Sequence, residues 1–558
     1  MKKILASILL ISLLQSCGRE SLEEINTDPN SFYTATPGSV LTYAQKQLAD
    51  YVSTPDVNVN NLRLTMQYWQ TTTYQDESRY NFSTRNVSNQ VWNRLYVRVF
   101  KNLDQTRKLV LAYQPTAAEA GTWEKTKKNQ LAIIDLQQVY AFQILVDTYG
   151  DIPYTQAGDV DVNPLPKYDS GKDVYASLIT RAKASIANLD TSGTSFGPTG
   201  ANSADKIYGG NVAKWKKFGN SLLLKLGISI ADSDPVLAKS TVEAAILGGV
   251  FTSKADDGVL TYLSASPNFS ALYTSLVASN RNDYVVGKTI VDKMNAGNDV
   301  RRDVYFQKNV HYLAGSVTGV SGNTVTFTPA STAPAAAPQV GDNVYVMPNT
   351  LVGTIASISG NSFTLNGYNA GSIVKDNDLG FGFFYKGGTI GASSSFNSNS
   401  RVGSFAYAAT TPGIILNYTE VAYYLAEASA RWGIAGTPAA NYAAAINASF
   451  SQWNKSAAEA AAYLLANPYD ATNWKKSIGE QAWISMYDQP TQSWTFYRRL
   501  DFPVLAPALS AVSESNNKVP VRLRYPVTEQ STNPTNYAAG SAAIGGDFLY
   551  TKIFWDKN

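Results

Sequence analysis

A buried helix is predicted where apolar residues recur at helical spacing, at Leu131, Ile134, Val139, Phe142 and Leu145. The string YGDIPY follows at residues 149–154. Gly150 suits the left-handed turn that ends many helices, and Pro153 cannot continue a helix. The pattern therefore predicts a helix that stops abruptly, with Tyr149 and Tyr154 at its end. These two tyrosines either cover the core or form the rim of a binding site.

Amphipathic stretches predict helices along most of the rest of the chain, at residues 37–51, 89–103, 173–189, 211–231, 236–247, 285–294, 417–432, 439–453 and 475–487. The alanine-rich stretch 417–453 has the composition of a closely packed tetratricopeptide-like helix pair. No strict period recurs elsewhere, so a regular solenoid is not expected.

A different pattern occupies residues 310–375, where charges are few and apolar residues alternate with polar ones. The string GSVTGVSGNTVTFT from Gly315 matches GTIASISGNSFTLN from Gly353. Each copy predicts two strands around a Ser-Gly-Asn turn. The predicted fold is mostly α: an irregular helical unit with tetratricopeptide-like helix pairs, long loops and a small β-hairpin insert. One helical domain would comprise residues 38–309 and 376–558, with the all-β insert at 310–375.

The first residues are typical of an export signal. Lys2 and Lys3 precede a short apolar run from Ile4 to Leu14, too short to span a bilayer. Leu14-Gln15-Ser16-Cys17 resembles the lipobox of bacterial lipoproteins, which predicts a signal peptide at 1–16, acylation of Cys17 and a tether at 17–37. The alternative is an ordinary signal with a stray cysteine. Two or more acyl chains would anchor the protein firmly without a membrane span.

Composition narrows the chemistry further. The chain has 558 residues and a formal net charge of +3, so it offers no basic surface suited to a nucleic acid. His311 is the single histidine and Cys17 the single cysteine, which removes most nucleophile–base arrangements. Zinc-ligand spacing and glycine-rich phosphate loops are absent. We expect no catalytic residue, no metal and no cofactor. Paired carboxylates, Asp76-Glu77 or Asp147 with Asp151, leave a glycosidase as the alternative.

Aromatic residues suggest where a ligand would bind. Tyrosine, at 34 residues, outnumbers phenylalanine, at 21, and its ring combines an apolar face with a polar edge. Rings and amide side chains mix without helical or strand regularity between Tyr68 and Tyr80. We expect the ligand-binding residues to be Trp69, Tyr74, Arg79 and Tyr80, with Tyr149 and Tyr154 as weaker candidates. The alternative for each ring is a place in the core.

Several strings together resemble the SusD/RagB-like outer-membrane lipoproteins, nearest to the SusD-like 2 subgroup. Besides the lipobox they are NTDPN, YGDIPYTQA, WKKFGNSLLLKLGISIAD, DYVVGKTIVDKMNAGNDVRRDVYF, YYLAEASARWG, WISMYDQPTQSWTFYRRLDFP and TKIFWD. Two features depart from the family pattern. The β insert interrupts it, and Asn298 to Arg301 stands where many relatives read Asp-Pro-Arg.

The resemblance implies a surface-exposed lipoprotein of the Gram-negative outer membrane, anchored by lipid only. Such proteins capture an oligomeric nutrient, here an oligosaccharide or a peptide, and deliver it to a TonB-dependent transporter of the SusC type. They are not enzymes. A surface glycan hydrolase and a structural adaptor that binds no solute remain the alternatives. The insert would be decoration, an extra ligand contact or a transporter contact.

Overall fold

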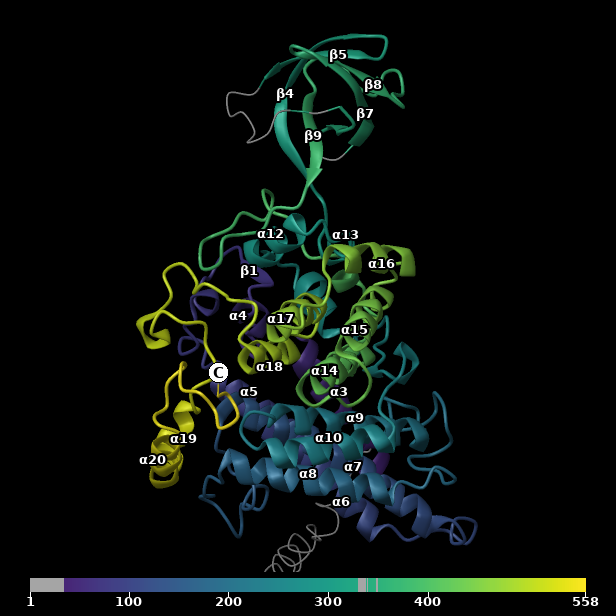
Figure 1. The fold of residues 1–558 in the computed structure, drawn as a ribbon, viewed down its shortest axis with the longest axis vertical. Coiled ribbons are helices and arrows are strands. Elements are labelled where there is room, and N and C mark those ends of the chain that lie inside the picture. Colours follow the sequence, from purple (N-terminus) through teal and green to yellow (C-terminus); the bar gives the residue numbers. More distant parts are fainter. Residues whose placement is uncertain (1–34, 330–337, 339, 348–349, 558) are drawn as a thin grey trace, which may run out of the picture.

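The computed structural model describes residues 35–329, 338, 340–347 and 350–557 (Figure 1). The predicted signal peptide at 1–16, the acylated Cys17 and most of the tether lie outside these residues. No helix in the described part of the chain combines the length and the apolar character that a membrane span needs.

The first part of the body runs from the N-terminal helix to the β insert. Its helices are α3 (Pro37–Ser53), α4 (Leu62–Thr65), α5 (Val87–Asn93), α6 (Lys101–Ala112), α7 (Trp123–Tyr149), α8 (Gly171–Asn188), α9 (Val212–Ser229), α10 (Pro235–Gly248), α11 (Ala271–Tyr273), α12 (Lys288–Ala296) and α13 (Arg302–Tyr305). A π-helical segment, η2 (Arg94–Phe100), joins α5 to α6. Helices α7, α8, α9 and α10 pack in sequence order.

The chain returns to the body after the insert. Its helices there are α14 (Tyr418–Trp432), α15 (Pro438–Gln452), α16 (Ala457–Ala466), α17 (Trp474–Ser485), α18 (Pro490–Leu500), α19 (Val527–Thr532) and α20 (Pro534–Ala543). The alanine-rich stretch forms the packed pair α14–α15. Short strands β1 (Trp69–Thr71), β2 (Gly258–Leu260), β3 (Tyr284–Val286) and β10 (Gly413–Leu416) make two small sheets, β1–β3 and β10–β2. The prediction of a mostly helical fold is confirmed.

Helix α7 ends where the sequence predicts. It stops at Tyr149, and Gly150 follows in the left-handed region with φ 86°. Asp147, in the last turn, is buried and accepts hydrogen bonds from the Tyr175 hydroxyl at 2.5 Å and from Trp555 Nε1 at 2.9 Å. Asp147 therefore ties α7 to α8 and to the C-terminal segment.

Two buried carboxylates on α14 pair with helices on either side of it. Glu420 lies 3.0 Å from the Nζ of Lys225 on α9, and both side chains are fully buried. Glu427 pairs with Arg499 on α18 and with Arg431 one turn along α14. A buried charge without a partner is costly, so these pairs fix how α9, α14 and α18 sit together.

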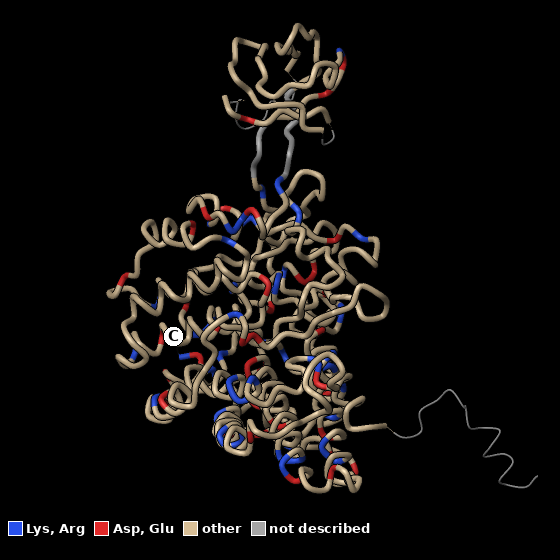
Figure 2. Tube along the Cα trace, turned by 90° about the vertical axis from the view of Figure 1, so that its right-hand side faces the viewer, with Lys and Arg blue, Asp and Glu red and all other residues tan. Residues whose placement is uncertain are grey.

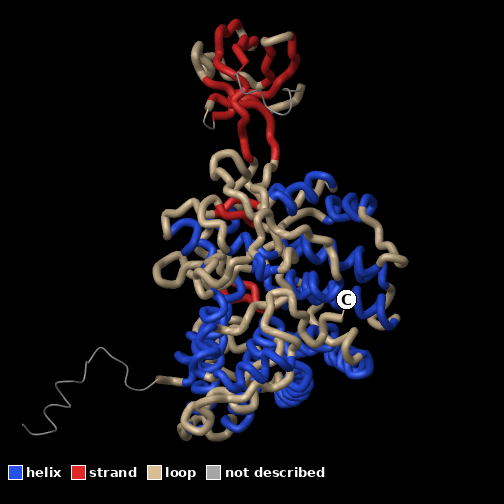
Figure 3. Tube along the Cα trace, turned by 90° about the vertical axis from the view of Figure 1, so that its left-hand side faces the viewer, coloured by secondary structure: helices blue, strands red, loops and turns tan. Residues whose placement is uncertain are grey.

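The insert is a closed barrel that projects from the body on two strands (Figures 1 and 3). Its strands are β4 (Asn309–Ser321), β5 (Thr324–Pro329), β6 (Asn343–Val346), β7 (Thr350–Ser359), β8 (Ser362–Asn366) and β9 (Asp378–Phe384), in the order β4-β5-β8-β7-β6-β9. Strand β9 begins at Asp378, so it lies wholly beyond residue 375, where the insert is predicted to end. The domain boundaries themselves stay a prediction.

The sequence repeat explains how strands β5 and β8 of the barrel pair. Gly315 and Gly353 start the two copies, so Val325 and Phe363 occupy equivalent positions. These two residues face each other where β5 pairs with β8. The two hairpins therefore meet around a local two-fold axis. Each copy supplies three residues of the apolar interior, Val317, Val325 and Phe327 from the first and Ile355, Phe363 and Leu365 from the second, and the interior is completed by Val344, Val352, Ile373, Leu379 and Phe381.

Removing the buried cation from α9 should destabilise the body. Lys225→Met leaves the Glu420 carboxylate buried without its cation, which should lower the free energy of unfolding by about 3–5 kcal/mol. Urea denaturation measures the change. The double variant Lys225→Met/Glu420→Gln should recover much of the loss. Lys239→Met breaks an exposed pair with Glu243 and should change stability by less than about 1 kcal/mol. Equal effects of the two single variants would contradict the assignment.

The barrel should be removable. Asn309 and Phe384 are register partners at its base, so a two-residue Asn-Gly turn can join them in place of residues 310–383. Because the barrel interior is a core separate from that of the body, thermal unfolding of the shortened protein should shift by less than about 5 °C. Loss of the folded circular dichroism signal would show instead that the body depends on the insert.

Candidate functional site

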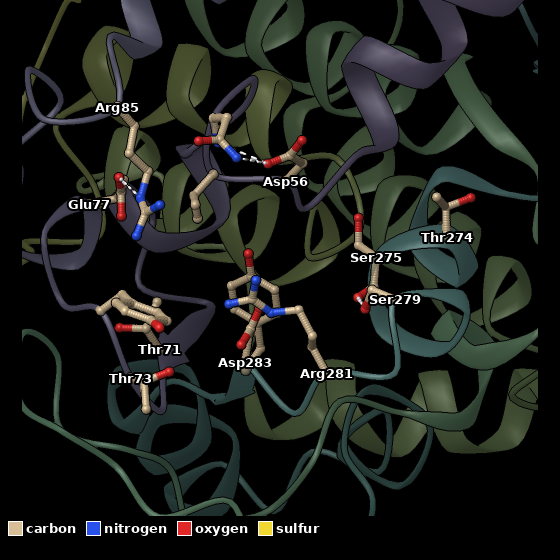
Figure 4. Close-up of a pocket in the computed structure, with 14 residues that line it drawn as sticks. Asp56, Thr71, Thr73, Glu77, Arg85, Thr274, Ser275, Ser279, Arg281 and Asp283 are labelled. Atoms are coloured by element: carbon tan, nitrogen blue, oxygen red, sulfur yellow. Dashed lines mark hydrogen bonds and ion pairs between the residues drawn. The ribbon is translucent and has the colours of Figure 1, made fainter.

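A pocket of about 290 Å³ opens on the body beside strand β1 (Figure 4). Two neighbouring segments, 56–58 and 71–85, and a distant one, 274–284, form it. Most of its lining residues are polar: Asp56, Val57, Asn58, Thr71, Thr73, Tyr74, Glu77, Arg85, Thr274, Ser275, Ser279, Arg281, Asp283 and Tyr284. The described part of the chain contains no group of three or more His, Cys, Asp or Glu residues placed to hold a metal ion.

The pairing of β1 with β3 brings the two main walls together. Thr71 is the register partner of Tyr284, and the Thr72 amide donates to the Asp283 carbonyl at 2.9 Å. Beyond Thr72 the chain turns away into a loop that contains a 3-10 turn, η1 (Glu77–Arg79). The strand pair thus places the loop with Tyr74 opposite the segment with Arg281.

Left-handed backbone conformations gather around this pocket. In the segments that lead to the pocket, non-glycine residues with positive φ are Gln67 at 59°, Tyr74 at 55°, Tyr80 at 68°, Asn86 at 54° and Asn280 at 54°, and others lie elsewhere in the described chain, from Asn298 to Asn517. Each such residue costs about 1 kcal/mol or more, so neighbouring contacts must hold it in place. The Gln67 side chain does so by donating to the Ala506 carbonyl at 2.6 Å. Strain of this kind is typical of functional sites.

Tyr74 is the aromatic residue that the pocket presents to solvent, with 60% of its surface exposed. Two guanidinium groups lie near its ring: Cζ of Arg85 is 5.4 Å from the ring centroid and Cζ of Arg281 is 5.8 Å away. These distances suit cation–π attraction. An exposed ring between two cationic donors can stack on a ligand while its neighbours form hydrogen bonds.

A carboxylate anchors each of these arginines. Nε of Arg85 lies 2.7 Å from Oε1 of Glu77, and Nε of Arg281 lies 2.7 Å from Oδ2 of Asp283. The Glu77 side chain is fully buried behind Arg85. Burial raises the pKa of Glu77, while its own backbone amide and the Arg85 charge oppose that rise. Glu77 therefore belongs to the support of the pocket wall.

Two of the predicted binding aromatics lie in the core instead. Trp69 is fully buried, with its ring 5.5 Å from that of Tyr284 and its Nε1 donating to the Tyr487 hydroxyl at 3.0 Å. Tyr80 is also fully buried, and its hydroxyl accepts a hydrogen bond from the Ala508 amide. Neither ring has a free face for a ligand in this structure. Tyr74, which lies between them, has a left-handed backbone conformation that breaks the regular alternation of sides.

The other predicted residues lie away from the pocket lining. Arg79 donates from Nε to the Gly391 carbonyl at 2.6 Å. Tyr149 is buried at the end of α7 and donates to the Ser88 carbonyl at 2.8 Å. Tyr154 is half-buried, with its hydroxyl 2.8 Å from Ser177 Oγ and 3.0 Å from a terminal nitrogen of Arg181. Of the six predicted residues, the structure brings only Tyr74 to the pocket.

Apart from Glu77, which the sequence offers only as part of the alternative carboxylate pair, the remaining lining residues were not predicted. Arg85 lies five residues past the aromatic cluster, and Arg281 and Asp283 enter through a strand pairing across some 200 residues. Nothing local in the sequence indicates that pairing. The Asp147–Asp151 carboxylate pair is absent from the pocket, because Asp147 is buried and Asp151 accepts a hydrogen bond from the Gly171 amide at 2.8 Å.

Stability measurements should separate the core ring from the pocket ring. Trp69→Ala should lower the free energy of unfolding by about 3–5 kcal/mol, because it leaves a cavity in the core. Tyr74→Ala should lower it by less than about 1 kcal/mol, because that ring is exposed and only its cation–π contacts are lost. Urea denaturation of both variants provides the test. A large loss for Tyr74→Ala would place that ring in the structural framework as well.

Solved structures share this fold along nearly the whole chain. A chitin-binding protein superimposes with a TM-score of 0.71 at 23% identity, covering 94% of this chain and 100% of its own. A SusD homologue from Bacteroides thetaiotaomicron gives 0.68 at 20% identity, covering 94% and 100%. A chitin-binding SusD homologue from Flavobacterium johnsoniae gives 0.66 at 20% identity, covering 93% and 99%. At these identities the likeness establishes the fold. No curated protein matches the chain.

A family model identifies the group to which the chain is related. The SusD-like 2 model, described as "Starch-binding associating with outer membrane", matches residues 29–354 and 345–526. The match covers both walls of the pocket and the helices that hold them. The chain therefore belongs to the SusD-like 2 family of proteins associated with the outer membrane.

Proposed function

We propose that this protein captures an oligosaccharide at the pocket around Tyr74 and delivers it to a SusC-like TonB-dependent transporter. The observation that carries the proposal is the exposed Tyr74 ring among hydrogen-bonding groups. A sugar ring can lay its C–H face on tyrosine while its hydroxyls bond to the surrounding polar groups. The family description and the chitin-binding structures support a glycan over a peptide.

The rest of the lining suits an uncharged, hydroxyl-rich ligand. Thr73, Ser275 and Ser279 each bring a hydroxyl group, which can donate and accept a hydrogen bond. Asn58 adds an amide on the opposite wall. Several weak polar contacts around one stacking surface give specificity for shape without deep burial of the ligand.

Delivery is the part of the proposal that rests on the family alone. The family associates with the outer membrane. Acylation of Cys17 would anchor the body at the cell surface, where a transporter barrel can receive the ligand. The family description, which names starch binding, also favours a binding protein over an enzyme. Of the two carboxylate pairs considered for a hydrolase, the first has Asp147 buried at the end of α7, and the second contributes Glu77, which is paired with Arg85.

Calorimetry on a protein lacking Cys17 tests ligand capture. The panel contains hexamers of N-acetylglucosamine, maltose-type, cellulose-type and mannan-type sugars, with a mixed peptide pool. At least one hexamer should bind, and Tyr74→Ala should weaken its binding about fivefold or more, since stacking on an aromatic ring contributes about 1 kcal/mol or more. Tyr43→Ala is the matched control, because Tyr43 is 44% exposed and lies outside the pocket lining.

Three outcomes would contradict the proposal. Equal losses of affinity in Tyr74→Ala and Tyr43→Ala would show that the pocket is not where the ligand binds. Product release from the hexamers, abolished by Glu77→Gln, would favour the hydrolase. Binding to no member of the panel, together with co-purification with a transporter barrel, would favour a structural adaptor.

A further inference from the structure

The two arginines of the pocket share one arrangement. Each contacts its carboxylate through Nε, at 2.7 Å, and each guanidinium carbon lies within 5.8 Å of the Tyr74 ring centroid. They come from unrelated segments, Arg85 from the loop after η1 and Arg281 from the turn before β3. Figure 4 shows Arg85 beside Glu77 on one wall and Arg281 beside Asp283 on the other segment.

This arrangement leaves the outer nitrogens of both arginines available. A guanidinium carries five N–H donors. In each arginine the closest approach to the carboxylate is at Nε, and for Arg85 this contact is an ion pair without hydrogen-bond geometry. Among the residues that the structure describes, no hydrogen bond involves the terminal nitrogens of Arg85 or Arg281. Arg85 is 29% exposed at its side chain and Arg281 is 54% exposed, so a ligand can reach both. The pocket thus offers two fixed donor groups near one stacking ring.

The charges of the lining residues determine whether the pocket favours an anionic or an uncharged ligand. Three carboxylates, Asp56, Glu77 and Asp283, face two guanidiniums, and the lining contains no lysine. Each guanidinium is already neutralised by its own carboxylate. An anionic ligand would gain little from such paired cations and would meet the unbalanced charge of Asp56. An uncharged oxygen acceptor avoids that repulsion and still takes the N–H bonds.

We propose that the pocket selects uncharged sugar units over acidic ones. Arg85 and Arg281 donate to hydroxyl, ring or acetamide oxygens of the sugar that stacks on Tyr74. Glu77 and Asp283 are positioning residues: they hold each guanidinium by Nε, aim its outer nitrogens at the ligand and cancel its charge. This inference rests on the proposed glycan capture and adds the class of glycan that is captured.

Matched pairs of hexamers test the selectivity. Each pair contains a neutral hexamer, of cellulose, starch or mannan type, and its C6-oxidised uronate with the same linkage. Wild-type protein should bind at least one neutral hexamer tenfold or more tightly than the matching uronate by calorimetry. Its affinity for the neutral hexamer should change less than twofold between 50 and 500 mM NaCl, because no net charge is exchanged.

Removing the two acids should relax the selectivity. Glu77→Gln/Asp283→Asn keeps the shape of both side chains and leaves the guanidiniums unneutralised. The uronate should gain tenfold or more in affinity, and its binding should become salt-dependent. Asp283→Asn alone, at a 26% exposed side chain, should give an intermediate gain and covers the case in which the buried Glu77 variant does not fold. Asp292→Asn, a 55% exposed acid outside the lining, should change nothing.

The outcomes separate the two proposals. A uronate that binds wild-type protein as tightly as its neutral partner, and loses affinity in Tyr74→Ala, overturns the selectivity and leaves glycan capture intact. An unchanged preference in both acid variants overturns the role of Glu77 and Asp283. Absence of Tyr74-dependent binding for every hexamer overturns glycan capture, and the selectivity with it.

Discussion

Buried ion pairs determine how the helices of the body pack, and they extend to the strand that forms the pocket edge. Glu420 and Glu427 hold α14 to α9 and α18 through Lys225 and Arg499. Just before α18, Asp488 pairs with Arg63 of α4 at 3.0 Å, and that guanidinium lies 4.9 Å from the ring centroid of Trp69 on β1. Such pairs add little net stability, yet each is costly to break, so they define one arrangement of the helices. Strand β1 and the pocket edge at Thr71 are held by this chain of contacts.

Figure 2 shows charges throughout the body and few on the barrel.

The abundance of tyrosine has mainly a structural explanation. Hydroxyls of buried tyrosines donate to backbone carbonyls of other elements, as Tyr140 does to Ile415, Tyr284 to Pro55 and Tyr305 to Ile484. A ring that fills the core and also satisfies a distant carbonyl fixes loops that carry no regular hydrogen bonding. The long connections of this fold are held in place by such contacts. Tyr74 differs because its ring remains exposed at a pocket that these rigid loops surround.

Local chemistry in the sequence predicts well, and long-range pairing does not. The end of α7 follows from Gly150 and Pro153, and the hairpins of the insert follow from period-two alternation and Ser-Gly-Asn turns. Closure of the barrel depends on β9 pairing with β4 and β6. The pocket likewise depends on β1 meeting β3. Both pairings join segments distant in the chain, which periodicity cannot reveal. Trp69 and Tyr74 could not be ranked from the sequence, because left-handed residues between Gln67 and Tyr80 break any regular alternation of sides.

The barrel brings different surface chemistry from the pocket, which argues that it does not extend the stacking site. Its rings Phe327, Tyr345, Phe363 and Phe381 are buried at 8% exposure or less. Its outer face carries hydroxyl pairs such as Thr326 with Ser362 and Ser357 with Thr364. These hydroxyls offer hydrogen bonds, and among the barrel rings whose side chains the structure describes only Tyr368 is partly exposed. The barrel also has its own interior, separate from the core that supports β1 and β3. The stacking site proposed at Tyr74 therefore depends on the core of the helical body, which is separate from the barrel interior.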